Sequence, residues 1–273
     1  MATINGIISI IKEKYQYLNP DVQTIVKNTV PMTGLCLRTA NSKMAPCIYI
    51  DNLLNSSISD EEAVEHIMHI FHSAKLNIDL SLLYDKNYLL SHIYLGLQRY
   101  DTSCNYITRP SDWDGIIEYM YLRGKSDSGY YQVKMTEALL KEANIPAELA
   151  WHVAETNTHA EIHIESMEQV ISHLTDCDEF DSLPCTNMWV VSNQHRINGA
   201  AVVKNIEHIK SWAIKQGYAT DGLILIFSSI HEAILVPAQS ATLDEISEMI
   251  KAVNNECVEA TEQLATQAYL LKF

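Results

Sequence analysis

Serine, histidine and glutamate stand within five positions in the segment Ser228-Ser229-Ile230-His231-Glu232, between two apolar runs. A serine hydroxyl whose proton passes to a histidine, itself oriented by a carboxylate, is the arrangement of serine hydrolases. One hypothesis is therefore a hydrolase centred on Ser229, His231 and Glu232. However, Gly-x-Ser-x-Gly is absent around these residues, and neighbours in a tight turn point in different directions. The sequence favours a structural turn closed by serine hydroxyls.

A second group of polar residues surrounds Asn198-Gly199, a dipeptide that strongly favours a hairpin turn. Asn193, Arg196 and Asn198, together with Ser228 of the other turn, are candidate binding residues. A helix predicted between the two hairpins would span about 16 Å at 1.5 Å per residue, which is the length of a five-residue strand. It would carry the chain back along the sheet. We therefore expect the two turns at opposite ends, where they build no shared site.

Histidine and glutamate alternate with apolar residues in the segment THAEIHIES, residues 158–166. If this segment is a strand, His159, Glu161 and His163 share one face. Imidazole and carboxylate groups suit zinc and similar ions, so a metal-binding protein is a further hypothesis. The alternative is the polar outer side of a half-buried strand, with no metal, which the sequence favours. No Gly-rich phosphate-binding motif occurs, so we expect no cofactor.

The composition restricts the class of partner. The chain has 273 residues with 34 acidic and 19 basic side chains, a formal net charge of −15. Direct nucleic-acid binding needs clusters of Lys and Arg, so it is not expected. The acidity indicates either solubility alone or an acidic surface that engages a basic protein.

Two further features indicate the compartment. The N-terminal apolar run is short and no basic segment precedes it, and no stretch reaches the roughly 18 apolar residues of a membrane span. The six cysteines include no Cys-x-x-Cys pair, so we interpret them as reduced thiols in a cytoplasm. We expect a cytoplasmic protein without membrane contact, and the sequence leaves its oligomeric state open.

The elements that must position these residues indicate an α+β fold. Residues 1–175 are expected to form an N-terminal α+β region of helices and β-hairpins. Residues 185–273 are expected to form a ββαββα module with an antiparallel-rich sheet. The acidic stretch between them, with Asp176, Asp178 and Glu179, is the expected surface connection.

Local signals locate several elements within this fold. Ser59 with Glu62, and Thr242 with Glu245, are capping boxes that predict helix starts. The segments GLILIF and AILVP predict a hairpin around the Ser228–Glu232 turn. The segments MWVVSN and GAAVVKN predict strands on either side of the Asn198-Gly199 turn. The C-terminal tail predicts an edge strand.

Several phrases, in this order, carry a family resemblance: GLCLRTANSKMAPCIYIDNLL, IIEYMYLRGKSDSGYYQVKMTEALLKEANI, AETNTHAEIHIESM, MWVVSNQHRINGAAVV and LILIFSSIHEAILVP. They resemble an uncharacterised bacterial family, the domain of unknown function numbered fifty-six eighty-eight, over nearly the whole chain. The resemblance implies a soluble protein of bacteria and mobile elements and transfers no catalytic residue. It implies that Asn198, Ser228, Ser229, His231 and Glu232 belong to the family pattern. The chain departs from the pattern at His159 and His163, which weakens the metal hypothesis.

The sequence therefore predicts a non-catalytic cytoplasmic module that binds a protein partner. If the chain is encoded on a mobile element, it could be an acidic inhibitor of a host or defence complex. The rival hypotheses are the hydrolase centred on Ser229, His231 and Glu232 and the metal-binding protein using His159, Glu161 and His163.

Overall fold

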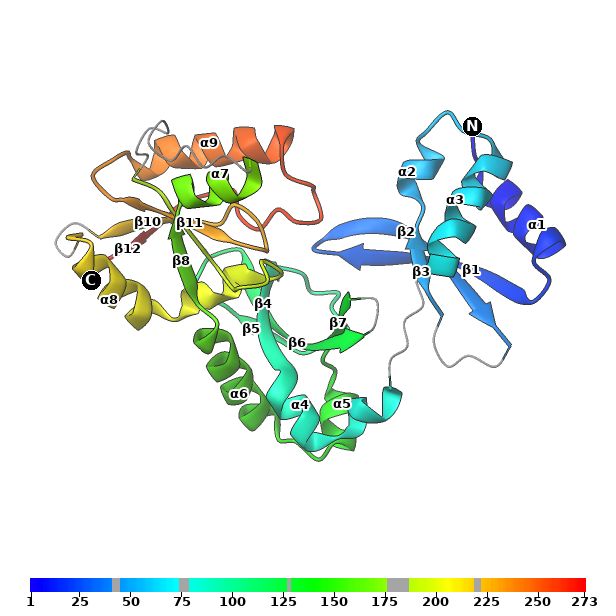
Figure 1. Cartoon of the computed structure of the whole chain (residues 1–273), viewed down its shortest axis with the longest axis horizontal. Coiled ribbons are helices and arrows are strands. Elements are labelled where there is room, and N and C mark those ends of the chain that lie inside the picture. Colours follow the sequence, from blue (N-terminus) through cyan, green and yellow to red (C-terminus); the bar gives the residue numbers. More distant parts are fainter. Residues whose placement is uncertain (41–44, 74–78, 127–128, 176–186, 219–221) are drawn as a thin grey trace. The chain divides into compact units, whose positions relative to one another are not determined.

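We describe the protein from a computed structural model, which describes residues 1–40, 45–73, 79–126, 129–175, 187–218 and 222–273. The chain divides into two compact units (Figure 1). Unit 1 comprises Met1–Ile78 with Lys125–Tyr130, and unit 2 comprises Asp79–Gly124 with Tyr131–Phe273. The registered strand pairs among the described residues are all antiparallel, so the expected α+β class is confirmed. No helix among the described residues is long and apolar enough to cross a membrane.

Unit 1 packs helices on a three-stranded sheet of order β1-β2-β3. Its elements are α1 (Ile4–Lys14), β1 (Leu18–Lys27), β2 (Val30–Thr39), β3 (Cys47–Tyr49), α2 (Asp51–Leu54) and α3 (Asp60–Ser73). Ile7 and Ile11 of α1, Leu35 of β2 and Ile67 of α3 are fully buried in one core. The predicted capping box at the start of α3 is confirmed, since Ser59 and Glu62 exchange hydrogen bonds.

The first sheet of unit 2 has the order β4-β6-β5, and β7 also pairs with β6. Its elements are η1 (Leu80–Tyr84), α4 (Lys86–His92), β4 (Ile93–Arg99), β5 (Thr108–Pro110), β6 (Ile116–Ser126), β7 (Gly129–Lys134), α5 (Glu137–Glu142) and α6 (Ala147–Ala160). The buried Thr158 of α6 accepts a hydrogen bond from the backbone N–H of Leu95 through its hydroxyl. This bond fixes α6 to β4.

The second sheet of unit 2 has five strands in the order β12-β10-β11-β9-β8. Its elements are β8 (His163–Ser166), α7 (Met167–Thr175), β9 (Trp189–Ser192), η3 (Gly199–Lys204), α8 (Ile206–Lys215), β10 (Leu223–Ile226), β11 (Ala233–Pro237), α9 (Leu243–Glu256) and β12 (Tyr269–Leu271). Ile246 and Ile250 of α9 pack on Ile224 and Ile226 of β10. The predicted β10–β11 hairpin, the edge position of β12 and the Thr242–Glu245 capping box are confirmed.

The predicted strand over GAAVVKN is wrong, because Gly199–Lys204 is the 3₁₀-helix η3. The reason is close packing. A Cβ atom on Gly199 would lie 2.2 Å from Ser192 Oγ and 2.6 Å from the His231 carbonyl oxygen. Asn198 also has φ +51°, which turns the chain out of extended geometry. A short apolar run buried on all sides has no periodicity that separates strand from helix. The C-terminal module is therefore not ββαββα.

The predicted strand over residues 158–166 is correct only in its second half. Helix α6 continues to Ala160, and β8 begins at His163. The acidic connection predicted at Asp176, Asp178 and Glu179 lies outside the described residues, so the domain boundary there stays a prediction. Strand β8 pairs with β9 and joins one sheet across that boundary.

Candidate functional site

The two polar turns lie together at one end of the five-stranded sheet. Strand β9 pairs directly with β11, with Val191 opposite Ala233. The Asn198 backbone N–H donates to His231 Nδ1 at 3.2 Å, and the Ser192 hydroxyl donates to the His231 carbonyl oxygen at 2.8 Å. The expectation that the turns lie at opposite ends is therefore wrong. Its premise failed because η3, and not a strand, follows β9.

The imidazole of His231 is held on both sides. Because Nδ1 accepts the Asn198 N–H, the ring proton sits on Nε2, which lies 3.4 Å from Oε1 of Glu262. The Ile230 backbone N–H also donates to the Glu262 carbonyl oxygen at 2.9 Å. Glu262 was not predicted from the sequence, since it lies some thirty residues away in the loop after α9.

Both serines of the turn bond to the backbone. Ser229 Oγ accepts the His231 N–H at 3.0 Å, and the Ser228 hydroxyl donates to the Glu232 carbonyl oxygen at 3.1 Å. The Ser229 N–H also donates to that oxygen, at 3.4 Å. Among the described residues, the His231 imidazole contacts the Asn198 backbone N–H and the Glu262 carboxylate. The geometry therefore places Ser229 and Glu232 as turn-closing groups beside His231.

Asn193 organises the neighbouring turn. Its buried side chain donates to the Ile197 carbonyl oxygen at 2.9 Å, and its Oδ1 accepts from the backbone N–H groups of His195 and Ile197. Asn is favoured in such turns because its amide bonds the backbone a few residues on.

The other two binding candidates of this turn contact different strands. The Asn198 side chain donates to Gln132 Oε1 of β7 at 2.7 Å. The Arg196 guanidinium pairs with the Glu165 carboxylate of β8. Asn198 therefore contacts His231, whereas Arg196 contacts Glu165.

The three metal candidates do not share a face. His159 lies in the last turn of α6, with Nε2 3.9 Å from a Glu155 oxygen. Both carboxylate oxygens of Glu161 pair with Arg123. His163 lies on β8 and faces Glu165. The residues separate because the helix ends between them, and no group of three potential ligands that could hold a metal ion occurs in the described part of the chain.

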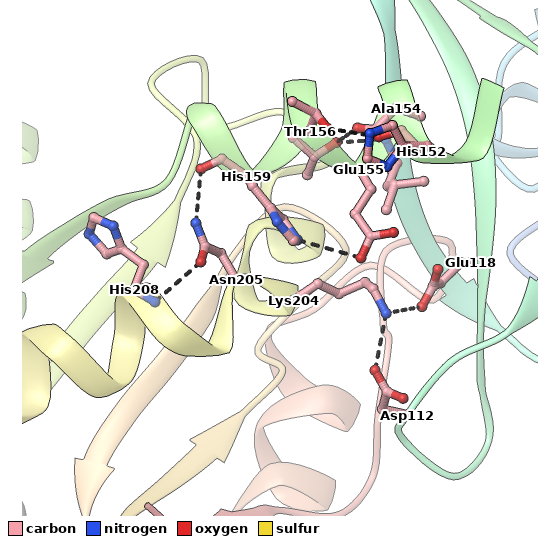
Figure 2. Close-up of polar contacts among 12 residues, drawn as sticks. Asp112, Glu118, His152, Ala154, Glu155, Thr156, His159, Lys204, Asn205 and His208 are labelled. Carbon is pink, nitrogen blue, oxygen red and sulfur yellow. Dashed lines mark hydrogen bonds and ion pairs between the residues drawn. The ribbon is translucent and has the colours of Figure 1, made fainter. Parts of the chain in front are cut away.

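A charge cluster that was not predicted from the sequence joins residues of β5, β6, α6 and η3. Figure 2 shows Asp112, Glu118, Glu155 and Lys204 of this cluster. Its members are Arg109, Asp112, Glu118, Glu155 and Lys204. Glu118, with a side chain 1% exposed, lies 2.6 Å from Arg109 Nε and 2.6 Å from Lys204 Nζ. Arg109 and Glu118 are direct cross-strand partners. The opposite charges of Arg109 and Glu118 at facing strand positions were the one feature of the sequence that could have indicated this cluster.

Electrostatics within the charge cluster favour the ionised forms. Burial alone would lower the pKa of Lys204, whose side chain is 9% exposed. Hydrogen bonding and attraction from Glu118, and then from Asp112, outweigh burial and raise that pKa. His159, beside the cluster, is the opposite case: burial lowers its pKa, despite the nearby Glu155. Its buried Nε2 has no hydrogen-bond partner among the described residues. Burial therefore favours the neutral form of the His159 imidazole.

An apolar groove, called the α9 groove below, runs between α9 and the sheet. It holds about 200 Å³. Ile226 and Ile234 form part of its lining on adjacent strands, and Met249, Ile250 and Val253 line it from α9. Met249 and Val253 are 46% and 45% exposed. Ser228 also lines it, which connects the groove to the turn that holds His231.

The solvent-facing side of α9 is acidic. Its exposed charged residues are Asp244, Glu245, Glu248, Lys251 and Glu256. The helix therefore presents four carboxylates and one ammonium group beside exposed apolar side chains.

Comparison with known proteins gives one match. A family model described as "Family of unknown function (DUF5688)" matches residues 6–272. No curated protein and no solved structure matches.

Proposed function

The chain belongs to the DUF5688 family of unknown function, and from that premise we propose that it is a non-catalytic, cytoplasmic protein that binds a partner protein. The α9 groove is the observation that carries the proposal. If the gene lies on a mobile element, the partner belongs to a host or defence complex that the chain inhibits.

The α9 groove has the chemistry of a docking site for one face of an amphipathic segment. Met249 and Val253 leave almost half of their accessible surface in water, although the groove lining beside them is apolar. A partner that covers these groups removes apolar surface from water, which is favourable by roughly 25 cal/mol per Å². The methionines at positions 188 and 249 suit such a site because an unbranched thioether adapts to differently shaped partners.

The negative charge of α9 and of the whole chain favours a basic partner. The four carboxylates of α9 and the net charge of −15 repel acidic proteins and attract basic ones. A basic amphipathic helix, which inserts apolar side chains at helical spacing and keeps Lys or Arg outside, matches both features. Association is expected to be faster at low salt, since complementary charges steer diffusional encounter.

Affinity purification from the native host with three proteins tests the proposal: the wild type, a Met249→Asp/Val253→Asp variant and an Ile214→Asp variant. Ile214 of α8 is the matched control, since it is 52% exposed and does not line the groove. We expect one stoichiometric basic partner with the wild type and Ile214→Asp, and its loss with the groove variant. Far-ultraviolet circular dichroism establishes that each variant is folded.

Two results contradict the proposal in different ways. A partner retained by the groove variant refutes the groove as the docking site. Recovery of no stoichiometric partner by the wild type refutes the interaction function itself.

A further inference from the structure

We propose that Cys36 and Cys47 of unit 1 form a modification site, at which a small-molecule disulfide such as oxidised glutathione converts the two thiols into an intramolecular disulfide. The proposal is independent of the partner-binding function, because it depends only on the pairing of β2 with β3.

Strand register places the two cysteines directly opposite each other. Cys36 pairs with Cys47 in the antiparallel β2–β3 ladder. The Leu37 N–H donates to the Pro46 carbonyl oxygen, and the Ile50 N–H donates to the Thr33 carbonyl oxygen, each at 3.0 Å. These bonds mark the hydrogen-bonded positions, which alternate along an antiparallel pair, so Cys36 and Cys47 occupy a non-hydrogen-bonded position.

That position has the dimensions of a disulfide. Opposed Cα atoms at non-hydrogen-bonded positions are about 4.5 Å apart, and disulfides join Cα atoms about 4.4–6.8 Å apart. Oxidation therefore needs side-chain rotation with little movement of the strands. A hydrogen-bonded position, at about 5.5 Å, brings the side chains less close.

The side chains already interact. Burial, followed by hydrogen bonding and charge interaction with Cys36, raises the pKa of Cys47 to about 12. A Cβ atom on Gly34, the neighbour of Cys36 on the same strand face, would lie 2.6 Å from Cys47 Sγ. The Cys47 sulfur therefore lies over a position without a side chain, on the strand face that Gly34 shares with Cys36. Both cysteines are only partly buried, so a small oxidant can reach them.

Two other cysteines provide a contrast. Cys104 accepts a hydrogen bond through its sulfur from Gln98 Nε2 at 3.2 Å, and Cys257 is exposed at the end of α9. Both belong to unit 2. They are the matched controls for general thiol reactivity.

The reaction balances through two exchanges. One cysteine of the pair loses its proton, and its thiolate attacks oxidised glutathione, breaking the S–S bond and releasing one glutathione thiolate. The thiolate of the second cysteine then attacks the mixed disulfide and releases the other glutathione. The two cysteines lose two hydrogens, and the oxidant is reduced to two thiols. Because the pKa of Cys47 is high, its thiolate is scarce at neutral pH, and exchange that uses it accelerates as pH rises.

The test equilibrates the full-length protein with buffers of varied reduced to oxidised glutathione ratio. Remaining thiols are then blocked with a maleimide, and intact mass and peptide mapping assign the bonds among all six cysteines. We expect a species that lacks two hydrogens, a Cys36–Cys47 cross-linked peptide, and no glutathione retained on either residue. The Cys104→Ser/Cys257→Ser variant should behave like the wild type.

Single substitutions sharpen the test. Cys36→Ser and Cys47→Ser should each retain glutathione on the remaining cysteine of the pair, because no second thiol displaces it. Wild-type protein that accumulates glutathione adducts without the Cys36–Cys47 peptide would overturn the proposal. So would a cross-link that disappears in the Cys104→Ser/Cys257→Ser variant. The wild-type peptide map decides the question even if a single variant does not fold.

Discussion

Removal of the buried carboxylate at the centre of the charge cluster should destabilise unit 2 strongly. Glu118 is 1% exposed and contacts two cations, one of which, Lys204, is 9% exposed. The substitution Glu118→Gln keeps the shape of the side chain but leaves the Lys204 ammonium buried without its main counterion. Arg109 retains Glu155 and its stacking over the Trp151 ring at 4.3 Å. Most of the loss should therefore arise at Lys204.

Breaking a buried ion pair by removing one partner costs about 3–5 kcal/mol. We expect a loss near the lower end of this range for Glu118→Gln, because Lys204 still contacts Asp112 at 3.0 Å. Lys204→Met should cost about the same, since it leaves Glu118 with Arg109 alone. The double variant should cost less than the sum of the two, with a coupling energy of about 1–3 kcal/mol. The matched control is Asp112→Asn, which removes a carboxylate 79% exposed and should cost under about 1 kcal/mol.

Urea unfolding followed by tryptophan fluorescence measures these free energies. All four tryptophans, Trp113, Trp151, Trp189 and Trp212, lie in unit 2, so the signal reports that unit alone. Costs below about 1 kcal/mol for both single variants, or strictly additive costs in the double variant, would refute the reasoning that the cluster is a buried, mutually dependent network.

Three further predictions use the same unfolding measurement. His231→Ala should lower the free energy of unfolding by about 1–3 kcal/mol, because the buried Asn198 N–H loses its acceptor. An unfolding midpoint equal to that of the wild type would mean that water replaces the imidazole at no cost. Burial lowers the pKa of His159 in the folded protein below its pKa in the unfolded chain. The contribution of His159 to stability is therefore present above the ordinary histidine pKa of about 6.5, and it is lost as pH falls through the lower pKa of the folded protein. His159→Asn should therefore flatten the decline of stability below that pH, and parallel curves for the two proteins would count against this assignment. Thr242→Ala should cost about 1 kcal/mol, because Thr242 and Glu245 cap α9 reciprocally; Thr242→Ser is the conservative control and should stay near the wild type.

The elements predicted correctly are those fixed by local chemistry. The β10–β11 hairpin follows from two apolar runs separated by a polar turn, and its register joins Ile226 with Ile234. The capping boxes at Ser59 and Thr242 are recognisable because each needs only residues three positions apart. Such signals depend on no distant partner, so the sequence alone reveals them.

The elements predicted wrongly depend on packing between distant segments. Gly199 follows Asn198 in a dipeptide typical of hairpins, but three backbone segments converge there and the chain continues as η3. The direct pairing of β9 with β11 spans about forty residues and brings the two turns together. The hydrophobic periodicity of a strand does not reveal which distant strand it pairs with. Because the pairing of β9 with β11 could not be predicted, the contact of Asn198 with His231 could not be predicted either.

The sequence predicted several residues of the candidate site but not how they are arranged. Asn198, Ser228, Ser229 and His231 do lie at one place, but Glu262 and the charge cluster were missed. Glu118 and Lys204 are far apart in sequence, and each is an ordinary charged residue in an otherwise apolar segment. Only the fold shows that both are buried.

The order of strands in the five-stranded sheet also has a consequence for folding kinetics. Its centre is the β10–β11 hairpin, which closes a short loop, while β9 and β12 join from opposite directions along the chain over long separations. Because closing long loops is entropically slow, we expect the hairpin to form early and the flanking strands to dock late. Substitutions in β12 should then accelerate unfolding more than they retard folding.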